Sequence, residues 1–231
     1  MSSFILKMIG ILTMTVDHIG SIVFPDLLFL RVIGRLAYPI FAFLISEGYR
    51  KTGDVTDYIG RLLVFAFFSQ LAYQHVFGTE RLNVLFTFAL ALYAIYKYEK
   101  TNNILVVFIV ALAAQLLHTE YGAYGVLMVF IFYRYHHNFK ETVKYFSLLA
   151  IAYVGYNVVS NYSDIQNSTI LFISIIQLFT IPSLLLIYLY NGKRGPRAKY
   201  LFYVFYPGHI LLIHYIYELI INYKVQRILG Q

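Results

Sequence analysis

The chain has 231 residues, of which 60% are hydrophobic and only 13% are charged, and its formal net charge is +7. Soluble domains carry about 25% charged residues, so this composition excludes an ordinary soluble fold. The absence of cysteine excludes disulfides, thiol nucleophiles and cysteine metal sites. We therefore expect an all-α polytopic membrane helix bundle, because a helix satisfies its backbone polar groups within its own segment.

Nine apolar segments follow one another, most of them near the roughly 20 residues that a helix needs to cross the hydrocarbon. The first contains Lys7 and no small-residue cleavage site follows it, so we expect it to stay attached rather than act as a signal peptide. The segments predict a single unit, residues 1–231, with about nine transmembrane helices (eight to ten possible): 4–24, 28–49, 57–77, 82–98, 103–118, 121–135, 142–160, 168–190 and 198–221.

Basic residues alternate between the loops. One set of alternate loops carries the basic residues of 50–51, 97–100, 134–144 and 193–199, whereas the other set is mainly acidic. The positive-inside rule places the basic set in the cytoplasm, and with it the N-terminus. We expect a multi-pass protein of the cell membrane, in a bacterium the cytoplasmic membrane, in contact with lipid.

Asp17 and His18 lie past the middle of the first segment. A charged side chain at membrane depth costs at least about 2.5–3.5 kcal/mol, so it usually faces the protein interior and commonly marks function. One reading is a structural polar pair that joins two helices. The other makes His18 a general base and Asp17 its orienting partner. Neighbouring positions on a helix point about 100° apart, so Asp17 can instead pair with another helix.

Arg31 and Arg35 open the second segment one helical turn apart, at a depth similar to that of Asp17. Arg31 suits a snorkelling anchor as well as a pocket residue. Arg35 lies deeper and needs a partner, and Asp17 is the nearest acid by depth. An ion pair between these two residues would organise a site.

Gln70, His118 and His209 are further polar positions in apolar helices. Each of the first two is more often an interhelical hydrogen bond than a ligand contact. His209 follows Tyr206-Pro207-Gly208 near the middle of the last segment. A proline and a glycine can loosen the helix there and make room for the imidazole to reach a central cavity.

The last basic loop holds four cations in seven residues, together with two glycines. Such a loop suits a polyphosphate ligand such as coenzyme A, although a topology anchor on anionic lipid explains the same charges. The four candidate donor-binding residues are Lys193, Arg194, Arg197 and Lys199. No cluster predicts a metal site.

Six strings of residues, in order along the chain, resemble the TraX family over essentially the whole length. They are Asp17-His18-Ile19, residues 34–42 (GRLAYPIFA), 61–73 (RLLVFAFFSQLAY), 82–88 (LNVLFTF), 121–128 (YGAYGVLM) and 205–209 (FYPGH). The family's namesake is a conjugation membrane protein that acetylates the N-terminus of pilin. The family also looks like a distant relative of multi-span acyltransferases that take an acyl group from a cytoplasmic thioester, commonly with a histidine base.

The resemblance implies an acetyl-CoA dependent membrane acetyltransferase in which His18 is catalytic and His209 is a second pocket residue. Its partners would be an acyl-CoA donor, membrane lipid and an unidentified peptide, pilin-like protein or glycan acceptor, without nucleic acid or metal. Two alternatives use the same residues differently. Buried Asp, His and Arg also form proton relays in proton-coupled transporters. The chain can also be a non-enzymatic assembly factor for surface proteins.

Overall fold

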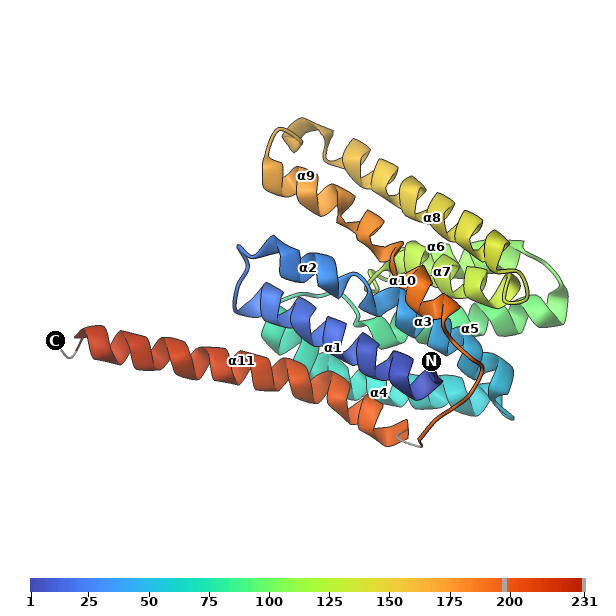
Figure 1. Cartoon of the computed structure of the whole chain (residues 1–231), viewed down its shortest axis with the longest axis horizontal. Helices are drawn as coiled ribbons and strands as arrows, with labels where there is room; N and C mark the ends of the chain where they lie inside the picture. The colour runs from blue at the N-terminus through green and yellow to red at the C-terminus, as the bar shows by residue number, and fades with distance from the viewer. Residues whose placement is uncertain (197–198, 230–231) are drawn as a thin grey trace.

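The computed structural model describes residues 1–196 and 199–229, and for 199–201 and 224–229 it describes the backbone alone. Eleven α-helices and two short 3₁₀-helices account for most of this part of the chain (Figure 1): α1 (Ser3–Ile22), α2 (Leu28–Gly34), α3 (Ala37–Lys51), α4 (Val55–Phe77), α5 (Val84–Thr101), α6 (Leu105–Leu116), α7 (Gly122–Arg134), α8 (Phe139–Ser160), η1 (Tyr162–Asp164), α9 (Ser168–Ile175), η2 (Ile176–Thr180), α10 (Ser183–Tyr188) and α11 (Lys199–Leu229). The all-α prediction is confirmed.

Polar residues that accept a hydrogen bond from the first helical turn mark where several helices begin. The side chain of Ser2 caps α1, that of Asp54 caps α4, and those of Asn83 and Asn138 cap α5 and α8. Such caps satisfy backbone N–H groups that have no partner inside the helix. The sequence therefore contains local start signals for helices whose interiors are set by hydropathy.

Six segments of the described chain are long and apolar enough to cross a membrane. They are Ser3–Ile22, Leu28–Lys51, Val55–Phe77, Phe139–Ser160, Ser168–Tyr188 and Phe202–Tyr223. Helices α5, α6 and α7 do not belong to this set. The 18 residues of α5 include Lys97, Glu99 and Lys100, and α6 and α7 have only 12 and 13 residues. At 1.5 Å per residue, α6 and α7 rise about 18–20 Å, short of a hydrocarbon core about 30 Å thick.

Large apolar side chains cover much of the outer surface of the long helices. Phe67, Phe68 and Leu71 on α4 are 67–74% exposed, and Val159 on α8 is 75% exposed. Exposed apolar area of this extent marks contact with a partner or a membrane, and on helices of this length it fits lipid. Apolar side chains thus fill the interior of the bundle and also cover much of its outer surface.

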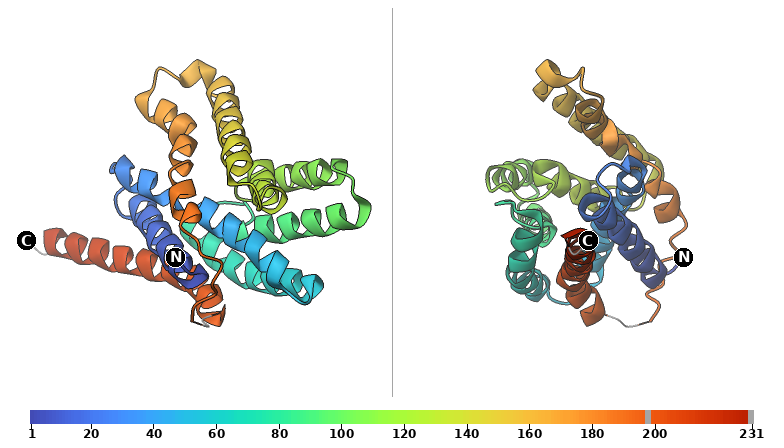
Figure 2. Two further views of the ribbon diagram at one scale, coloured as in Figure 1. Left: turned by 45° about the vertical axis from the view of Figure 1, so that its right-hand side comes forward. Right: turned by 90° about the vertical axis from the view of Figure 1, so that its left-hand side faces the viewer.

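The centre of the bundle is α3, which packs against α1, α5, α7 and α10. In Figure 1, α11 runs along α4 and continues past the bundle to the C-terminus. Helices α8 and α9 lean away from the other helices in both views of Figure 2. Contacts between residues at or next to the basic loops place these loops at one end of the bundle, which we call the basic end. Lys51 donates to the Tyr190 hydroxyl, and the hydroxyls of Tyr49 and Tyr133 both donate to Glu99.

Two of the six long segments are interrupted near a proline. Pro39 has no N–H for the carbonyl of Arg35, and the helix breaks between α2 and α3 at that residue. Pro182 stands in the same relation to Leu178, where η2 replaces the α-helix. By contrast, α11 runs through Pro207 as one helix, so the proline of the last segment does not break it.

Candidate functional site

An acid on α1 is held by two arginines from the next segment. Arg35 Nη2 donates to Asp17 Oδ1 at 2.6 Å, and Arg31 Nη1 donates to Asp17 Oδ2 at 2.9 Å. The Asp17 and Arg35 side chains are only 12% and 9% exposed. Gly34 permits this approach, because a Cβ at that position would overlap the Asp17 side chain. The expected Asp17–Arg35 ion pair is present, and Arg31 completes a three-residue cluster.

The partner of His18 comes from the other end of the chain. His18 Nδ1 lies 2.8 Å from His209 Nε2 on α11, and the two imidazole rings are nearly parallel, at 17°. The ring of Phe77 on α4 packs against His18 with centroids 5.4 Å apart. Asp17 makes no hydrogen bond to His18 within the described structure. Of the two partners weighed for Asp17 in the sequence, arginine is the correct one.

The hydrogen bonds of the histidine pair assign its proton positions. His209 Nδ1 lies 2.7 Å from the carbonyl oxygen of Phe205, which can only accept, so this nitrogen carries a proton. With both rings neutral, His209 Nε2 is then an acceptor and His18 Nδ1 must donate to it. The free lone pair of His18 is consequently on Nε2. His18 is therefore arranged as a base, with His209 holding its tautomer in the way that a carboxylate or carbonyl often does.

Two further residues of the site, Glu120 and Tyr121, lie at the link between α6 and α7 and were not among the candidates named from the sequence. The α4–α5 and α6–α7 links are tied together where Leu82 N donates to the His118 carbonyl and Glu120 N donates to the Leu82 carbonyl. This places Tyr121 Oη 3.5 Å from Arg35 Nη1, and Glu120 close enough to interact electrostatically with Arg35. The signal available in the sequence was an acid, Glu120, next to Tyr121 and between two short apolar segments.

The two other predicted pocket residues lie elsewhere. The side-chain amide of Gln70 is buried, and it bonds the Arg81 carbonyl and both the backbone and side-chain nitrogens of Asn83. Gln70 thus fastens the α4–α5 link to α4. The side chain of His118 is exposed on the α6–α7 link, where its backbone adopts a φ of 51°. Neither residue joins the histidine pair or the arginine cluster.

A cleft of about 460 Å³ opens at the basic end, and we call it the basic cleft. It lies between α1, α3, α4, α5 and α11, and its lining includes four cations and one acid, Glu47. Glu47 is paired with Arg50 and Lys51. Arg61 makes no ion pair with the described residues, and its buried Nε has no hydrogen-bond partner. The cations that line the cleft are Lys7, Lys51, Arg61 and Arg194.

Arg194 reaches the basic cleft because its loop is fixed to the start of α1. Ser3 N donates to the Lys193 carbonyl, and Ser3 Oγ donates to the Arg194 carbonyl at 2.7 Å. The Lys193 side chain is exposed and does not line the cleft. Of the other two predicted donor-binding residues, Arg197 lies outside the described residues, and only the backbone of Lys199 is described.

The basic cleft leads toward the histidine pair. On α1 it is lined by Lys7, Ile11 and Met14, and His18 is the next position along that face of the helix. On α11 the last lining residue along the chain is Tyr206, three positions before His209. Two helix faces that line the cleft thus continue to the two imidazoles.

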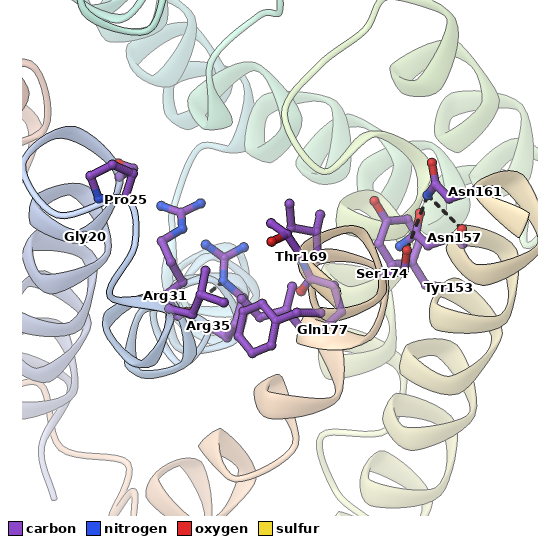
Figure 3. A pocket seen from close by; sticks show the side chains of 15 residues that line it. Gly20, Pro25, Arg31, Arg35, Tyr153, Asn157, Asn161, Thr169, Ser174 and Gln177 are labelled. Atoms are coloured by element: carbon purple, nitrogen blue, oxygen red, sulfur yellow. Dashed lines mark hydrogen bonds between the residues drawn. The ribbon is translucent and has the colours of Figure 1, made fainter. Parts of the chain in front are cut away.

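A second cavity, of about 420 Å³, lies between the α1–α2 region and the α8–α9 hairpin, and we call it the arginine pocket (Figure 3). The guanidinium groups of Arg31 and Arg35 lie side by side on one wall. Side chains that carry amide or hydroxyl groups supply much of the remaining polar lining: Ser21, Tyr153, Asn157, Asn161, Thr169, Ser174 and Gln177.

Long apolar helices around a partly buried histidine pair and a largely buried ion-pair cluster define an all-α membrane protein with a polar interior site. The sequence profile of the TraX protein family matches residues 2–217, and the chain belongs to this family. The family resemblance inferred from the six sequence strings is confirmed.

Two relatives with given names are similar to this chain over half of its length or more. The chain is 29% identical over 233 residues to the probable fimbrial assembly protein FimC of Dichelobacter nodosus, covering 92% of this chain and 94% of that protein. It is 29% identical over 135 residues to protein TraX of Escherichia coli, covering 56% of this chain and 54% of that protein. No solved structure matches.

Proposed function

We propose that this TraX-family chain is an integral membrane acyltransferase that transfers an acetyl group from acetyl-CoA to an amine or hydroxyl of a surface molecule. The observation that carries the proposal is that the faces of α1 and α11 that line the basic cleft also carry the histidine pair. The face of α1 that bears Lys7 and Met14 also bears His18. A donor whose phosphates sit at the cleft mouth would direct its thioester toward this base.

The charges of the basic cleft support an acyl-CoA donor. Four cations face one acid that already has two basic partners, so the lining has an excess of positive charge. Arg61 in particular has a buried donor without a partner. Phosphate oxygens accept charge-assisted hydrogen bonds from such groups, and Arg binds them in a bidentate manner.

The proposed chemistry uses the free Nε2 of His18. As the acceptor nitrogen or oxygen attacks the thioester carbonyl, His18 Nε2 takes its proton, a role worth typically 10²–10⁴-fold in rate. The tetrahedral intermediate collapses by breaking the carbon–sulfur bond, and the thiolate of coenzyme A leaves and recovers the proton from the imidazolium. His209 steadies that imidazolium by accepting the Nδ1 hydrogen bond. The apolar helices around the site keep water away from the thioester.

A cytoplasmic donor requires the basic end to face the cytoplasm, and we propose this orientation for the cell membrane. The positive-inside rule supports it. The contact between Leu82 and Thr119 also supports nine passes across the membrane, because it joins the α4–α5 and α6–α7 links away from the basic end. The short α6 and α7 would then reach the other face together with the link between them, which is bonded to the α4–α5 link.

The names of the relatives favour a fimbrial or pilin-like protein as the acceptor. One is a fimbrial assembly protein and the other is TraX. A surface glycan remains the alternative acceptor. Mass spectrometry of the surface peptides and glycans of cells with and without the gene should find a 42 Da acetyl mark that depends on it, a mass that follows from replacing one hydrogen by an acetyl group.

A binding experiment tests the donor site directly. The full-length protein in nanodiscs should bind coenzyme A, and the Arg61→Gln and Arg194→Gln variants should each bind it about tenfold or more weakly, as expected for loss of a charge-assisted hydrogen bond. Lys193→Gln is the matched control, since this cation neighbours Arg194 but does not line the cleft. Equal affinity in all four proteins would contradict the donor site, and absence of binding would favour a transporter or an assembly factor.

A further inference from the structure

The two interrupted segments of the bundle meet each other. The break after α2 at Arg35 and the 3₁₀ segment η2 each follow from a proline four residues beyond a carbonyl, and α2 packs against η2. Irregular backbone at membrane depth is tolerated where it is buried in protein or lines a polar cavity. In multi-span proteins, interrupted helices commonly form binding sites for small ligands.

The cavity at this junction is the arginine pocket, and it is separate from the proposed catalytic centre. Neither His18 nor His209 is among its lining residues. Its volume of about 420 Å³ falls in the range of small-ligand sites. Figure 3 shows Arg31, Arg35, Thr169 and Gln177 together on one part of the wall.

Two polar groups of this wall lack partners inside the protein. Gln177 is only 8% exposed, and its Oε1 is buried without a hydrogen bond. An unpaired buried acceptor costs about 1–3 kcal/mol, and an occupant toward which the amide of Gln177 turns would remove this penalty by donating to it. Arg31 uses only Nη1 in its contacts with Asp17, which leaves Nη2 and Nε without hydrogen bonds to the described residues.

The charges of the pocket wall indicate which charged group a ligand would carry. Two guanidinium groups line the pocket and no carboxylate does, because Asp17 lies behind them between α1 and α2. An ammonium group would be repelled here, whereas an anionic oxygen can accept from Arg31. The remaining amides and hydroxyls, such as Asn157 and Thr169, suit a hydroxylated ligand.

We propose that the arginine pocket binds a phosphorylated polyol, with the phosphate on Arg31 and a hydroxyl on the side-chain amide of Gln177. A glycerol-type lipid head group and a free sugar or glycerol phosphate share this chemistry. The proposal does not depend on acyl transfer, and it adds a second ligand site to the protein.

The test uses the full-length protein and two probes. Thermal unfolding is measured in nanodiscs of phosphatidylglycerol and of phosphatidylcholine, and sn-glycerol 3-phosphate is titrated against protein in phosphatidylcholine nanodiscs. Stabilisation by phosphatidylglycerol alone identifies a lipid head group, and saturable binding of glycerol 3-phosphate identifies a soluble ligand. Each outcome supports the site, and the absence of both overturns it.

Gln177→Leu separates binding from folding. Because Gln177 Oε1 has no internal partner, the unliganded variant should be at least as stable as the wild type, yet it should lose about three- to tenfold in probe affinity. Arg31→Gln should lose about tenfold or more. Arg81→Gln, an exposed cation beyond the end of α4, is the control and should keep full affinity. Unchanged affinity in Gln177→Leu overturns the assignment.

Discussion

Gly34 in α2 tests the contact on which the arginine cluster depends. A Cβ at this position would overlap the Cβ, the Cγ and one oxygen of Asp17, so the whole acidic side chain would have to move. Overpacking costs about 1–3 kcal/mol. The displaced carboxylate would also leave Arg35, 9% exposed, without its ion-pair partner, at a cost of about 3–5 kcal/mol. We expect Gly34→Ala to destabilise the protein by at least about 3 kcal/mol.

Gly155 provides the matched control for this substitution. It also lies inside a helix, α8, but a Cβ there would meet nothing within 4 Å. Gly155→Ala should stabilise the helix by about 0.5–1 kcal/mol, because alanine loses less backbone entropy than glycine on folding. Equilibrium unfolding of the purified variants in mixed detergent micelles, followed by circular dichroism, gives both values. Equal stability of the two variants would refute the packing of α2 against Asp17.

Three further predictions follow from the histidine pair, the ion pair and the orientation. His18→Ala should abolish acetyl transfer while coenzyme A still binds. His209→Gln can still accept a hydrogen bond from His18 Nδ1, so it should keep more activity than His209→Ala in single-turnover assays. Equal loss of activity in both His209 variants would contradict the role of His209 in fixing the His18 tautomer. Asp17→Asn and Arg35→Gln should each reduce stability, and the double variant should be less destabilised than the two losses added, by roughly 0.5–3 kcal/mol, whereas strict additivity would exclude a direct pair. Because the chain has no cysteine, Lys193→Cys can be labelled alone, and we expect an impermeant maleimide to miss it in intact cells and to reach it in inverted vesicles.

Hydropathy determined the positions of the helices. Each of the nine apolar segments overlaps a helix or an interrupted helix, because the need to satisfy backbone polar groups acts segment by segment. The ends differ by a few residues, except that α11 continues to Leu229, eight residues beyond the predicted end. Hydropathy did not determine how many of these segments are long enough to cross a membrane. The described chain has six such segments, and α6 and α7 are too short by helical rise alone. Their link is fixed to the α4–α5 link through Leu82 and Thr119, a contact between distant parts of the chain that local hydropathy does not encode.

The sequence also identified which ionisable residues needed an explanation, since Asp17, His18 and Arg35 stand in apolar surroundings where a charge is costly. Only the tertiary structure decided their partners. Adjacent residues on α1 point to different neighbours, so Asp17 turns to α2 while His18 meets His209, 191 positions away. Such pairing depends on how distant helices pack, and no local pattern in the chain encodes that distance.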